Sequence, residues 1–335
     1  MKSFWKNKNV LITGINGFVG GNLAKHLLQE EANVFGLIRN NTEKSFIFYE
    51  NLVKNINLIR GDITDYQILR GLFAENKINT CFHLAAQVEV GVAKSFPYLT
   101  WETNVRGTYT LLEAIREAPY KLDSVIVASS DKSYGEYPSS KMPYQENYPL
   151  KPEYPYDTSK ACTDYIAQSY SSNLYNIPII ITRFANIYGP GQLNFSALIP
   201  DSIRSALGYS NFIPRGDGNS VRDFLYVDDV CNLYLLLACE LSKSYDLSGQ
   251  IFNAGTNSYH KVKDIIKQIF YSLNQLEEYE KIKKQFSGKS SKGEIDIQYM
   301  NFDKLNKLFN WSPVTNFDDG INKTISWFKD YLLKN

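Results

Sequence analysis

The sequence predicts an α/β protein, with a doubly wound parallel sheet followed by a smaller α/β lobe. In its first half, short apolar runs alternate with longer stretches of helical periodicity, the pattern of a parallel sheet covered on both faces. A glycine-rich segment directly follows the first apolar run, and after about residue 185 turn-rich segments interrupt the helical patterns. We therefore expect two closely packed domains, residues 1–185 and 186–335, with some chain crossing between them.

The strands expected in the first domain are short and apolar. They cover residues 10–12, 34–38, 56–59, 81–84 and 125–127. Leu23, Leu27 and Leu28 mark one face of the helix expected after the first strand. In the second domain we expect turns at 188–191 and 215–219 and a solvated polar segment at 277–292.

The composition limits the classes of partner. Among 335 residues, 36 basic and 35 acidic side chains leave a formal net charge of +1, so no global field favours nucleic acid or a membrane surface. Cys81, Cys162, Cys231 and Cys239 form no Cys-x-x-Cys pair and no histidines cluster, so we expect no metal site. Buried thiols in a reducing compartment, together with no long apolar stretch at the N-terminus, predict a cytoplasmic protein.

The glycine-rich segment predicts a dinucleotide site in a Rossmann-type domain. Three glycines, spaced three residues apart, lie between an expected strand and an expected helix. They allow the backbone to approach a pyrophosphate, and the helix N-terminus adds free N–H groups and a favourable dipole. A simple turn is the alternative, which the strand before and the helix after make less attractive. The expected NAD(P) contacts in this segment are Gly14, Asn16, Gly17, Phe18, Val19 and Gly20.

The ends of the second and third strands are expected near the adenosine. An acidic residue after the second strand would bind the ribose 2′-hydroxyl, whereas a basic residue would meet a 2′-phosphate. Arg39 occupies this place, so NADP is slightly favoured over NAD, unless Arg39 simply faces solvent. Asp62 and Ile63 are expected beside the adenine, with a turn or helix cap as the alternative for Asp62.

Tyr156 and Lys160 are four residues apart and therefore on one face of an expected helix. An ammonium beside a phenol favours the phenolate, which can accept a proton from a substrate hydroxyl while hydride leaves the same carbon. Such a pair also arises by chance on many helices. Together with the glycine-rich segment, it indicates a catalytic pair.

These motifs together resemble the extended short-chain dehydrogenase/reductase family. The resemblance continues through residues 83–87, 103–108, 183–191 and 221–229, nearly the whole chain. It implies that Leu84, Ala85 and Ala86, with Tyr156 and Lys160, contact the cofactor. It also implies substrate contacts from Gln87, Asn104, Asn186 and Arg222. The amide of Asn186 and the guanidinium of Arg222 suit oxygen-rich anions, although Asn186 also suits a turn.

Members of this family differ in the segment that follows the fifth strand. Sugar 4-epimerases lack a proton donor at the position of Asp131, and thymidine-linked 4,6-dehydratases carry an Asp-Glu pair there. The cytidine-linked glucose 4,6-dehydratases carry Ser-Asp-Lys, as this chain does at Ser130, Asp131 and Lys132. The chain is therefore most similar to the CDP-glucose 4,6-dehydratases, while Arg39 is more similar to the NADP-using GDP-mannose dehydratases.

The resemblance implies a dehydration with no net redox change. Tyr156 would accept the C4 hydroxyl proton with Ser130 holding that hydroxyl, and Lys160 would tune Tyr156. Tightly bound NAD(P) would take the C4 hydride and return one to C6, after Asp131 protonates the leaving C6 hydroxyl and Lys132 removes the C5 proton. The alternative for Asp131 and Lys132 is a surface ion pair at a strand end.

Other functions remain open on the same scaffold. A nucleotide-sugar 4-epimerase or decarboxylase would share the cofactor residues and differ at Asp131 and Lys132. A non-catalytic dinucleotide-binding protein would have no use for Tyr156 and Lys160, and both are present. The expected partners are a nucleotide sugar and a second copy of the chain in a homodimer, with no nucleic acid and no membrane.

Overall fold

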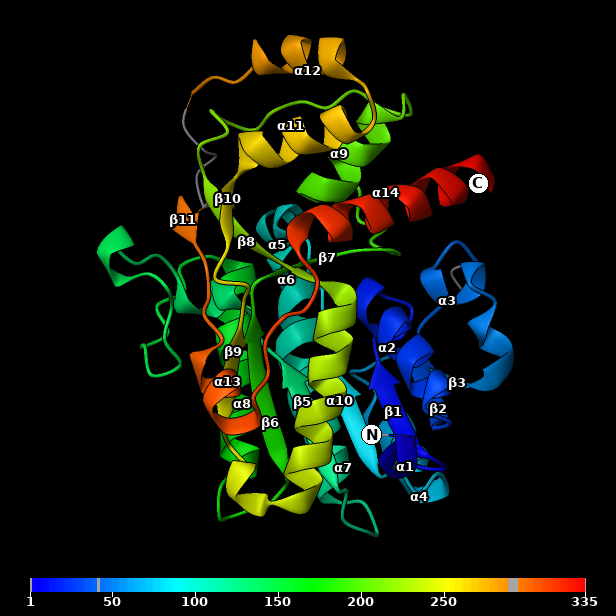
Figure 1. Ribbon diagram of the computed structural model, residues 1–335. Coiled ribbons are helices and arrows are strands. Elements are labelled where there is room, and N and C mark those ends of the chain that lie inside the picture. The colour runs from blue at the N-terminus through cyan, green and yellow to red at the C-terminus, as the bar shows by residue number, and fades with distance from the viewer. Residues whose placement is uncertain (1, 41–42, 289–294, 335) are drawn as a thin grey trace. The chain divides into compact units, whose positions relative to one another are not determined.

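A seven-stranded sheet organises the first of the two units into which the chain divides in the computed structural model (Figure 1). The structure describes residues 2–40, 43–288 and 295–334. The first unit comprises residues 1–135, 149–183 and 230–252, and the second comprises 136–148, 184–229 and 253–335. The chain thus changes unit next to the boundary expected at residue 185, and it does so again around 136–148 and 230–252.

The sheet has the order β3-β2-β1-β4-β5-β6-β9, and each neighbouring pair from β3 to β6 is parallel. The strands are β1 (Asn9–Thr13), β2 (Asn33–Ile38), β3 (Ile56–Arg60), β4 (Thr80–His83), β5 (Ser124–Ala128), β6 (Ile179–Phe184) and β9 (Ile251–Ala254). The direction of chain progression reverses between β1 and β4, which is the place where doubly wound sheets bind ligands. The predicted fold class and all five predicted strands are confirmed.

Helices cover both faces of this sheet because its strands are apolar on both sides (Figure 1). Leu11, Cys81 and Val125 join the core beneath α4, α7 and α8, while Phe82 packs on Tyr234 of α10. The α-helices of this unit are α1 (Lys2–Trp5), α2 (Phe18–Gln29), α3 (Phe46–Tyr49), α4 (Tyr66–Glu75), α5 (Val90–Ser95), α6 (Pro97–Thr100), α7 (Gly107–Arg116), α8 (Pro155–Ser171) and α10 (Val227–Lys243). Its shorter turns are η1 (Leu52–Asn55), the π-helical turn η2 (Trp101–Arg106), η3 (Asp131–Tyr134) and η5 (Tyr245–Leu247).

The second unit has a small sheet built around β8 (Val221–Tyr226). The other strands are β7 (Asn186–Tyr188), β10 (Tyr259–Lys261) and β11 (Ile297–Gln298). Strands β7 and β11 run parallel to β8, and β10 runs antiparallel to it. The helices are η4 (Ser139–Lys141), α9 (Leu198–Ala206), α11 (Val262–Ser272), α12 (Leu276–Lys283), α13 (Asp303–Phe309) and α14 (Phe317–Lys334).

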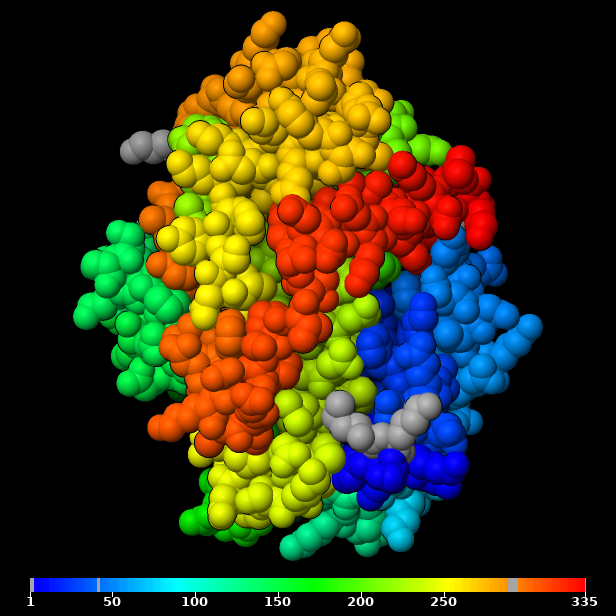
Figure 2. Space-filling model, in the orientation of Figure 1, coloured from blue at the N-terminus to red at the C-terminus, as the bar shows by residue number. Residues whose placement is uncertain are grey.

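This unit has its own apolar core, formed mainly by α9, α11 and α14 against the aromatic side chains of β7 and β8. Helices α11 and α14 are both visible on the face shown in Figure 2. The segment expected to be solvated, 277–292, begins in α12, where Tyr279 and Ile282 nevertheless join the core. Residues 289–292 of that segment lie outside the described residues.

Candidate active site

The glycine-rich segment connects β1 to α2 and is packed too closely for side chains. Gly14 has a φ of +76°, and a Cβ atom on it would lie 2.8 Å from the backbone nitrogen of Ala85. A Cβ on Gly20 would lie 2.3 Å from the carbonyl oxygen of Gly14. Glycine is therefore needed at both positions, and α2 begins at Phe18 directly behind the bend. This cradle fits the pyrophosphate of a dinucleotide at a helix N-terminus.

The other expected cofactor residues follow neighbouring strands at the same edge of the sheet. Leu84, Ala85 and Ala86 come directly after β4, and the Asn16 side chain donates to the carbonyl of Asn40 after β2 at 3.0 Å. Val19, behind Phe18, lies in the first turn of α2, and its side chain is half-buried. The sheet order therefore brings the expected residues together, as a shared site requires.

Arg39 and Asp62 lie at the ends of β2 and β3. The Arg39 side chain is 60% exposed, and its guanidinium lies 3.9 Å from the Asp62 carboxylate. Asp62 also caps a turn, accepting from the backbone nitrogen and hydroxyl of Thr64 at 2.9 and 2.7 Å. The turn considered as the alternative for Asp62 is thus present, and Ile63 beside it is buried.

A buried hydrogen-bond chain links the glycine segment to the helices. The backbone nitrogens of Leu84 and Ala85 donate to the Thr13 hydroxyl at 3.2 Å, and that hydroxyl lies 2.9 Å from Nδ1 of His83. On the other side, Nε2 of His83 lies 3.0 Å from the hydroxyl of Thr108, which donates to the Asn104 carbonyl at 2.5 Å. Because Thr108 uses its only hydrogen on that carbonyl, His83 must donate from Nε2 and accept at Nδ1.

Burial, with a smaller contribution from the charge of Lys160, lowers the pKa of His83 to about 3. A neutral imidazole agrees with the donor and acceptor roles that the chain of hydrogen bonds requires. Sequence reasoning placed the segment 83–87 in the family motif but gave His83 itself no role.

Asn104 lies in the π-helical turn η2 and is buried. Its side-chain oxygen accepts from the Gln87 nitrogen at 2.7 Å, and its amide nitrogen donates to the Gln87 carbonyl at 3.0 Å and to the Ser159 hydroxyl at 2.8 Å. Both amide N–H groups are used within the protein, so the expected substrate contact has no free donor in this structure. The Gln87 side chain accepts from Thr100 and donates to the carbonyl of Glu89, both at 3.0 Å.

The expected catalytic residues Ser130, Asp131, Lys132 and Tyr156 gather where β5 ends. The Ser130 hydroxyl donates to Asp131 at 3.0 Å, and it lies near enough to Tyr156 to act on the pKa of that phenol. Ser130 also accepts from the backbone nitrogen of Lys132 at 3.2 Å, at the start of η3. Asp131 is buried, with 4% of its surface exposed, which rules out the surface ion pair considered as its alternative. Lys132 is half-buried.

Tyr156 and Lys160 both lie on α8 and are both buried, as the four-residue spacing predicts for one helix face. Burial raises the pKa of Tyr156, while the nearby Ser130 hydroxyl acts to lower it. Burial lowers the pKa of Lys160 to about 8, against the opposing charge of Asp164. The Lys160 ammonium donates to the carbonyl of Ala128 at 2.7 Å. At neutral pH Lys160 is therefore mostly charged.

Asn186 and Arg222 belong to the second unit. Asn186 begins β7, not a turn, and its amide donates to the carbonyl of Asp223 at 3.2 Å. Arg222 is buried on β8, and its guanidinium donates to the carbonyls of Val221 and Asp296 at 2.9 and 3.3 Å.

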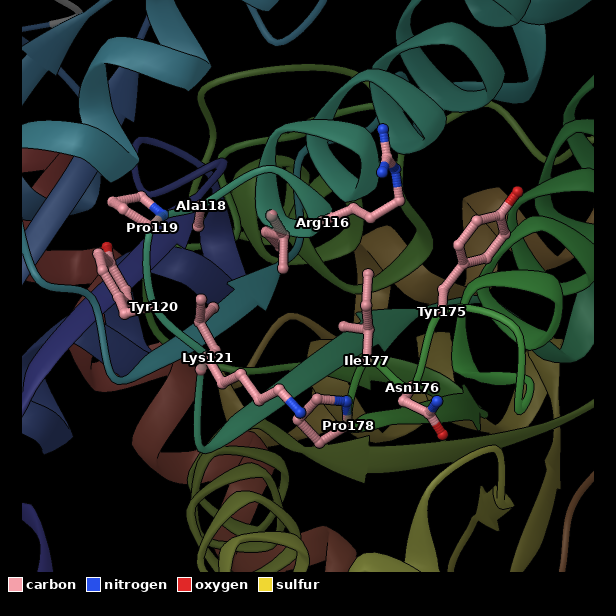
Figure 3. Close-up of a pocket in the computed structure, with 11 residues that line it drawn as sticks. Arg116, Ala118, Pro119, Tyr120, Lys121, Tyr175, Asn176, Ile177 and Pro178 are labelled. Atoms are coloured by element: carbon pink, nitrogen blue, oxygen red, sulfur yellow. The ribbon is translucent and has the colours of Figure 1, made fainter.

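One cavity of about 290 Å³ lies away from these residues (Figure 3). Its lining includes Tyr120, Lys121 and Pro178, which precede β5 and β6. It is thus at the amino ends of the parallel strands, whereas Ser130 and Asp131 follow a carboxyl end. We do not assign it to the catalytic residues.

Within the part of the chain that the structure describes, no group of three or more histidine, cysteine or acidic side chains is arranged to hold a metal ion. No helix there is both long and apolar enough to cross a membrane.

Known proteins resemble this chain over nearly its whole length. A family model described as GDP-mannose 4,6 dehydratase matches residues 11–324. Human dTDP-D-glucose 4,6-dehydratase is 30% identical over 328 residues, which cover 96% of this chain and 90% of the relative.

Solved structures agree with the fold. A dTDP-glucose 4,6-dehydratase from Bacillus anthracis in complex with NAD matches with a TM-score of 0.82 and 28% identity, covering 96% of this chain and 97% of that one. A UDP-glucose 4-epimerase from Thermotoga maritima with UDP-glucose matches with a TM-score of 0.85 and 26% identity, covering 97% and 99%. The match of family model and human relative over almost the entire chain shows that this protein belongs to the nucleotide-sugar 4,6-dehydratase family of extended short-chain dehydrogenases/reductases.

Proposed function

We propose that this protein is a 4,6-dehydratase that converts a nucleoside diphosphate hexose, with CDP-glucose as the favoured substrate, to the 4-keto-6-deoxyhexose. The observation that carries the proposal is the placement of Asp131: a buried carboxyl group that accepts a hydrogen bond from Ser130 and lies near enough to Tyr156 for its charge to act on that phenol. The proposed proton donor for the C6 hydroxyl thus lies near the residue that would accept the proton of the C4 hydroxyl. The choice of CDP-glucose rests on the Ser-Asp-Lys sequence at 130–132 alone.

In the first step Tyr156 accepts the proton of the C4 hydroxyl, which Ser130 helps to hold. Burial of Tyr156 opposes ionisation, so the charge of Lys160 on the same helix face is needed to stabilise the phenolate. The bound dinucleotide supplies a hydride acceptor for C4 and a hydride donor for C6. The backbone carbonyl of Ala128 holds the Lys160 ammonium in place.

In the second step the C5 proton, made acidic by the C4 ketone, is removed and water leaves from C6. Lys132, half-buried beside Asp131 in η3, is the proposed base, and Asp131 the proposed acid. Because the hydride returns to the same sugar, the dinucleotide should not be consumed in proportion to product.

A nucleotide-sugar 4-epimerase is the second candidate, because an epimerase structure matches this chain as well as the dehydratases do. The two candidates share Tyr156 and Lys160 and differ in their need for Asp131. Incubating the purified protein with CDP-glucose, UDP-glucose, dTDP-glucose and GDP-mannose and weighing the products separates them. A product lighter by one water supports the dehydratase, and a product isomeric with its substrate contradicts it.

The cofactor is proposed to be NADP in preference to NAD, because Arg39 follows β2, at the position where a basic residue would meet the 2′-phosphate of NADP. Two dehydratase structures that match this chain contain NAD, so the preference rests on this one residue. Denaturing the purified protein and identifying the released dinucleotide tests the proposal, and NAD alone would show it to be wrong.

A homodimer and a cytoplasmic location are also proposed. Helices α6, α7 and α8 carry the exposed aromatic side chains Tyr98, Tyr109 and Tyr165, the kind of surface that a second copy would cover. Sedimentation of the purified protein tests the dimer, and a monomer at micromolar concentration would contradict it. All four cysteines are free, as a reducing compartment requires.

A further inference from the structure

A buried arginine connects the two segments that carry the expected catalytic residues. Arg183 on β6 is 2% exposed, and its guanidinium donates to both carboxylate oxygens of Asp164 on α8, at 2.7 and 3.0 Å. A third nitrogen donates to the hydroxyl of Tyr134, the last residue of η3, at 2.8 Å. We propose that Arg183 is a positioning residue, which holds α8 and η3 in the relative placement that the proposed dehydration needs.

The contact with Asp164 fixes the helix that carries Tyr156 and Lys160. Residues 156, 160 and 164 are spaced four apart, so they lie along one face of α8. A bidentate pair between an arginine fork and a carboxylate restrains both distance and orientation. Asp164 is fully buried and lies one helical turn after Lys160. The Arg183 guanidinium therefore restrains the rotation of α8 about its axis at that turn.

The contact with Tyr134 fixes the far end of the turn that carries Asp131 and Lys132. The Tyr134 ring lies against the guanidinium, with 4.7 Å between the carbon of that group and the ring centre. The near end of the turn is fixed independently, because Ser129 donates its backbone nitrogen to the carbonyl of Thr182 at 2.8 Å and its hydroxyl to the carbonyl of Lys160 at 3.1 Å. At the Tyr134 end, the backbone nitrogen of Lys151 donates to the Tyr134 carbonyl at 3.1 Å, and Arg183 adds the side-chain hydrogen bond.

This arrangement predicts that the two halves of the reaction can be impaired separately. Tyr134→Phe keeps the ring on the guanidinium and removes only the hydroxyl that accepts from Arg183. The Tyr134 end of the turn then loses its side-chain hydrogen bond, while the pair that holds α8 stays intact. A displacement of about 1 Å in a catalytic group can cost about 100-fold in rate. We expect water elimination to slow by about 10- to 100-fold and C4 oxidation to change by less than about twofold.

The matched control is Tyr170→Phe. Tyr170 lies on the same helix and donates its hydroxyl to the carboxylate of Glu113 at 2.9 Å, remote from the residues of either step. It loses the same atom, here a hydroxyl that donates to a carboxylate where that of Tyr134 accepts from a guanidinium, and it should leave both rates unchanged. Thermal unfolding of both variants shows whether a general loss of stability accounts for any difference. Asp164→Asn makes the complementary change. It weakens the pair that holds α8, the helix that carries Tyr156 and Lys160, so it should slow C4 oxidation.

The experiment is a single turnover of the full-length protein with its bound dinucleotide and CDP-glucose. Reduced nicotinamide absorbance reports oxidation, and mass spectrometry of the quenched sugar reports loss of water. Reduced cofactor accumulating beside an undehydrated 4-keto sugar in Tyr134→Phe, but not in Tyr170→Phe, supports the proposal. If the wild type dehydrates its substrate and Tyr134→Phe slows both steps equally, or slows neither, the positioning role of Arg183 is wrong. The proposed function then still stands. A wild type that returns an isomeric sugar from every nucleotide sugar tested overturns the proposed function and this inference with it.

Discussion

The neutral state of His83 makes a quantitative prediction about stability and pH. In the unfolded chain a histidine has a pKa of about 6.5, whereas burial lowers the pKa of His83 in the folded protein to about 3. Between these values the unfolded state binds a proton that the folded state does not. The contribution of His83 is therefore fully present above about pH 6.5 and is lost as the pH falls towards 3.

The size of the effect follows from the two pKa values. Each pH unit in this window costs about 1.4 kcal/mol of unfolding free energy, so lowering the pH from 7 to 4.5 costs about 3 kcal/mol from His83 alone. Carboxylates titrate in part of the same pH range and also change the unfolding free energy. A variant without His83 is therefore needed to separate the contribution of His83 from theirs. His83→Gln removes the titration, so the slope of unfolding free energy against pH should be shallower by about 1 kcal/mol per unit than in the wild type.

Urea unfolding of both proteins between pH 4.5 and 6.5 measures that difference. Nitrogen NMR of labelled histidine provides a second measurement, because it distinguishes the Nε2–H tautomer from the other neutral form and from the cation. The chain has three histidines, and substituting His26 and His260 assigns the other two signals. Equal slopes in the two proteins, or a His83 signal that titrates near pH 6, would refute the reasoning.

Three other substitutions test the site. Gly20→Ala should cost about 1–3 kcal/mol of stability and weaken dinucleotide binding, because its Cβ would lie 2.3 Å from the Gly14 carbonyl oxygen. The control Gly71→Ala, whose Cβ would have nothing within 4 Å, should be neutral or stabilising by up to about 1 kcal/mol. Denaturant unfolding of both variants measures the difference. Arg39→Ala should weaken NADP binding about tenfold or more and leave NAD binding unchanged by calorimetry, and equal losses for both would contradict the assigned role. Asn104→Asp replaces both buried N–H donors by an acceptor and should destabilise the fold by about 1–3 kcal/mol, a claim that an unchanged melting temperature would disprove.

The strands and the cofactor edge were predictable because each depends on short stretches of sequence. The predicted strands are apolar on both faces, and the residues that follow them reach one edge in any parallel sheet. The spacing of Tyr156 and Lys160 specifies a shared helix face without further information. These features need no knowledge of distant contacts.

The support beneath the site was not predictable, because it depends on contacts between distant residues. Arg183 and Asp164 are 19 positions apart, on a strand and a helix, and nothing in their spacing marks them as partners. Asn104 was expected to contact substrate from the family resemblance alone, yet its side chain in η2 is hydrogen-bonded to the backbone of Gln87. The four-residue spacing from Lys160, which places an acid on the same helix face, was the sequence signal at Asp164.

The π-helical turn at Trp101–Arg106 has a consequence for changes in chain length. A π turn holds one residue more than the α-helical turn it replaces, and here it exposes the Asn104 carbonyl to the hydroxyls of Thr108 and Thr163. Deleting one residue from this turn would restore a regular helix and rotate everything before it by about 100° relative to α7. Insertions and deletions are usually tolerated where helices meet loops. In this chain the junction between α6 and α7 should tolerate neither. A chimaera or variant that gains or loses a residue there should be insoluble.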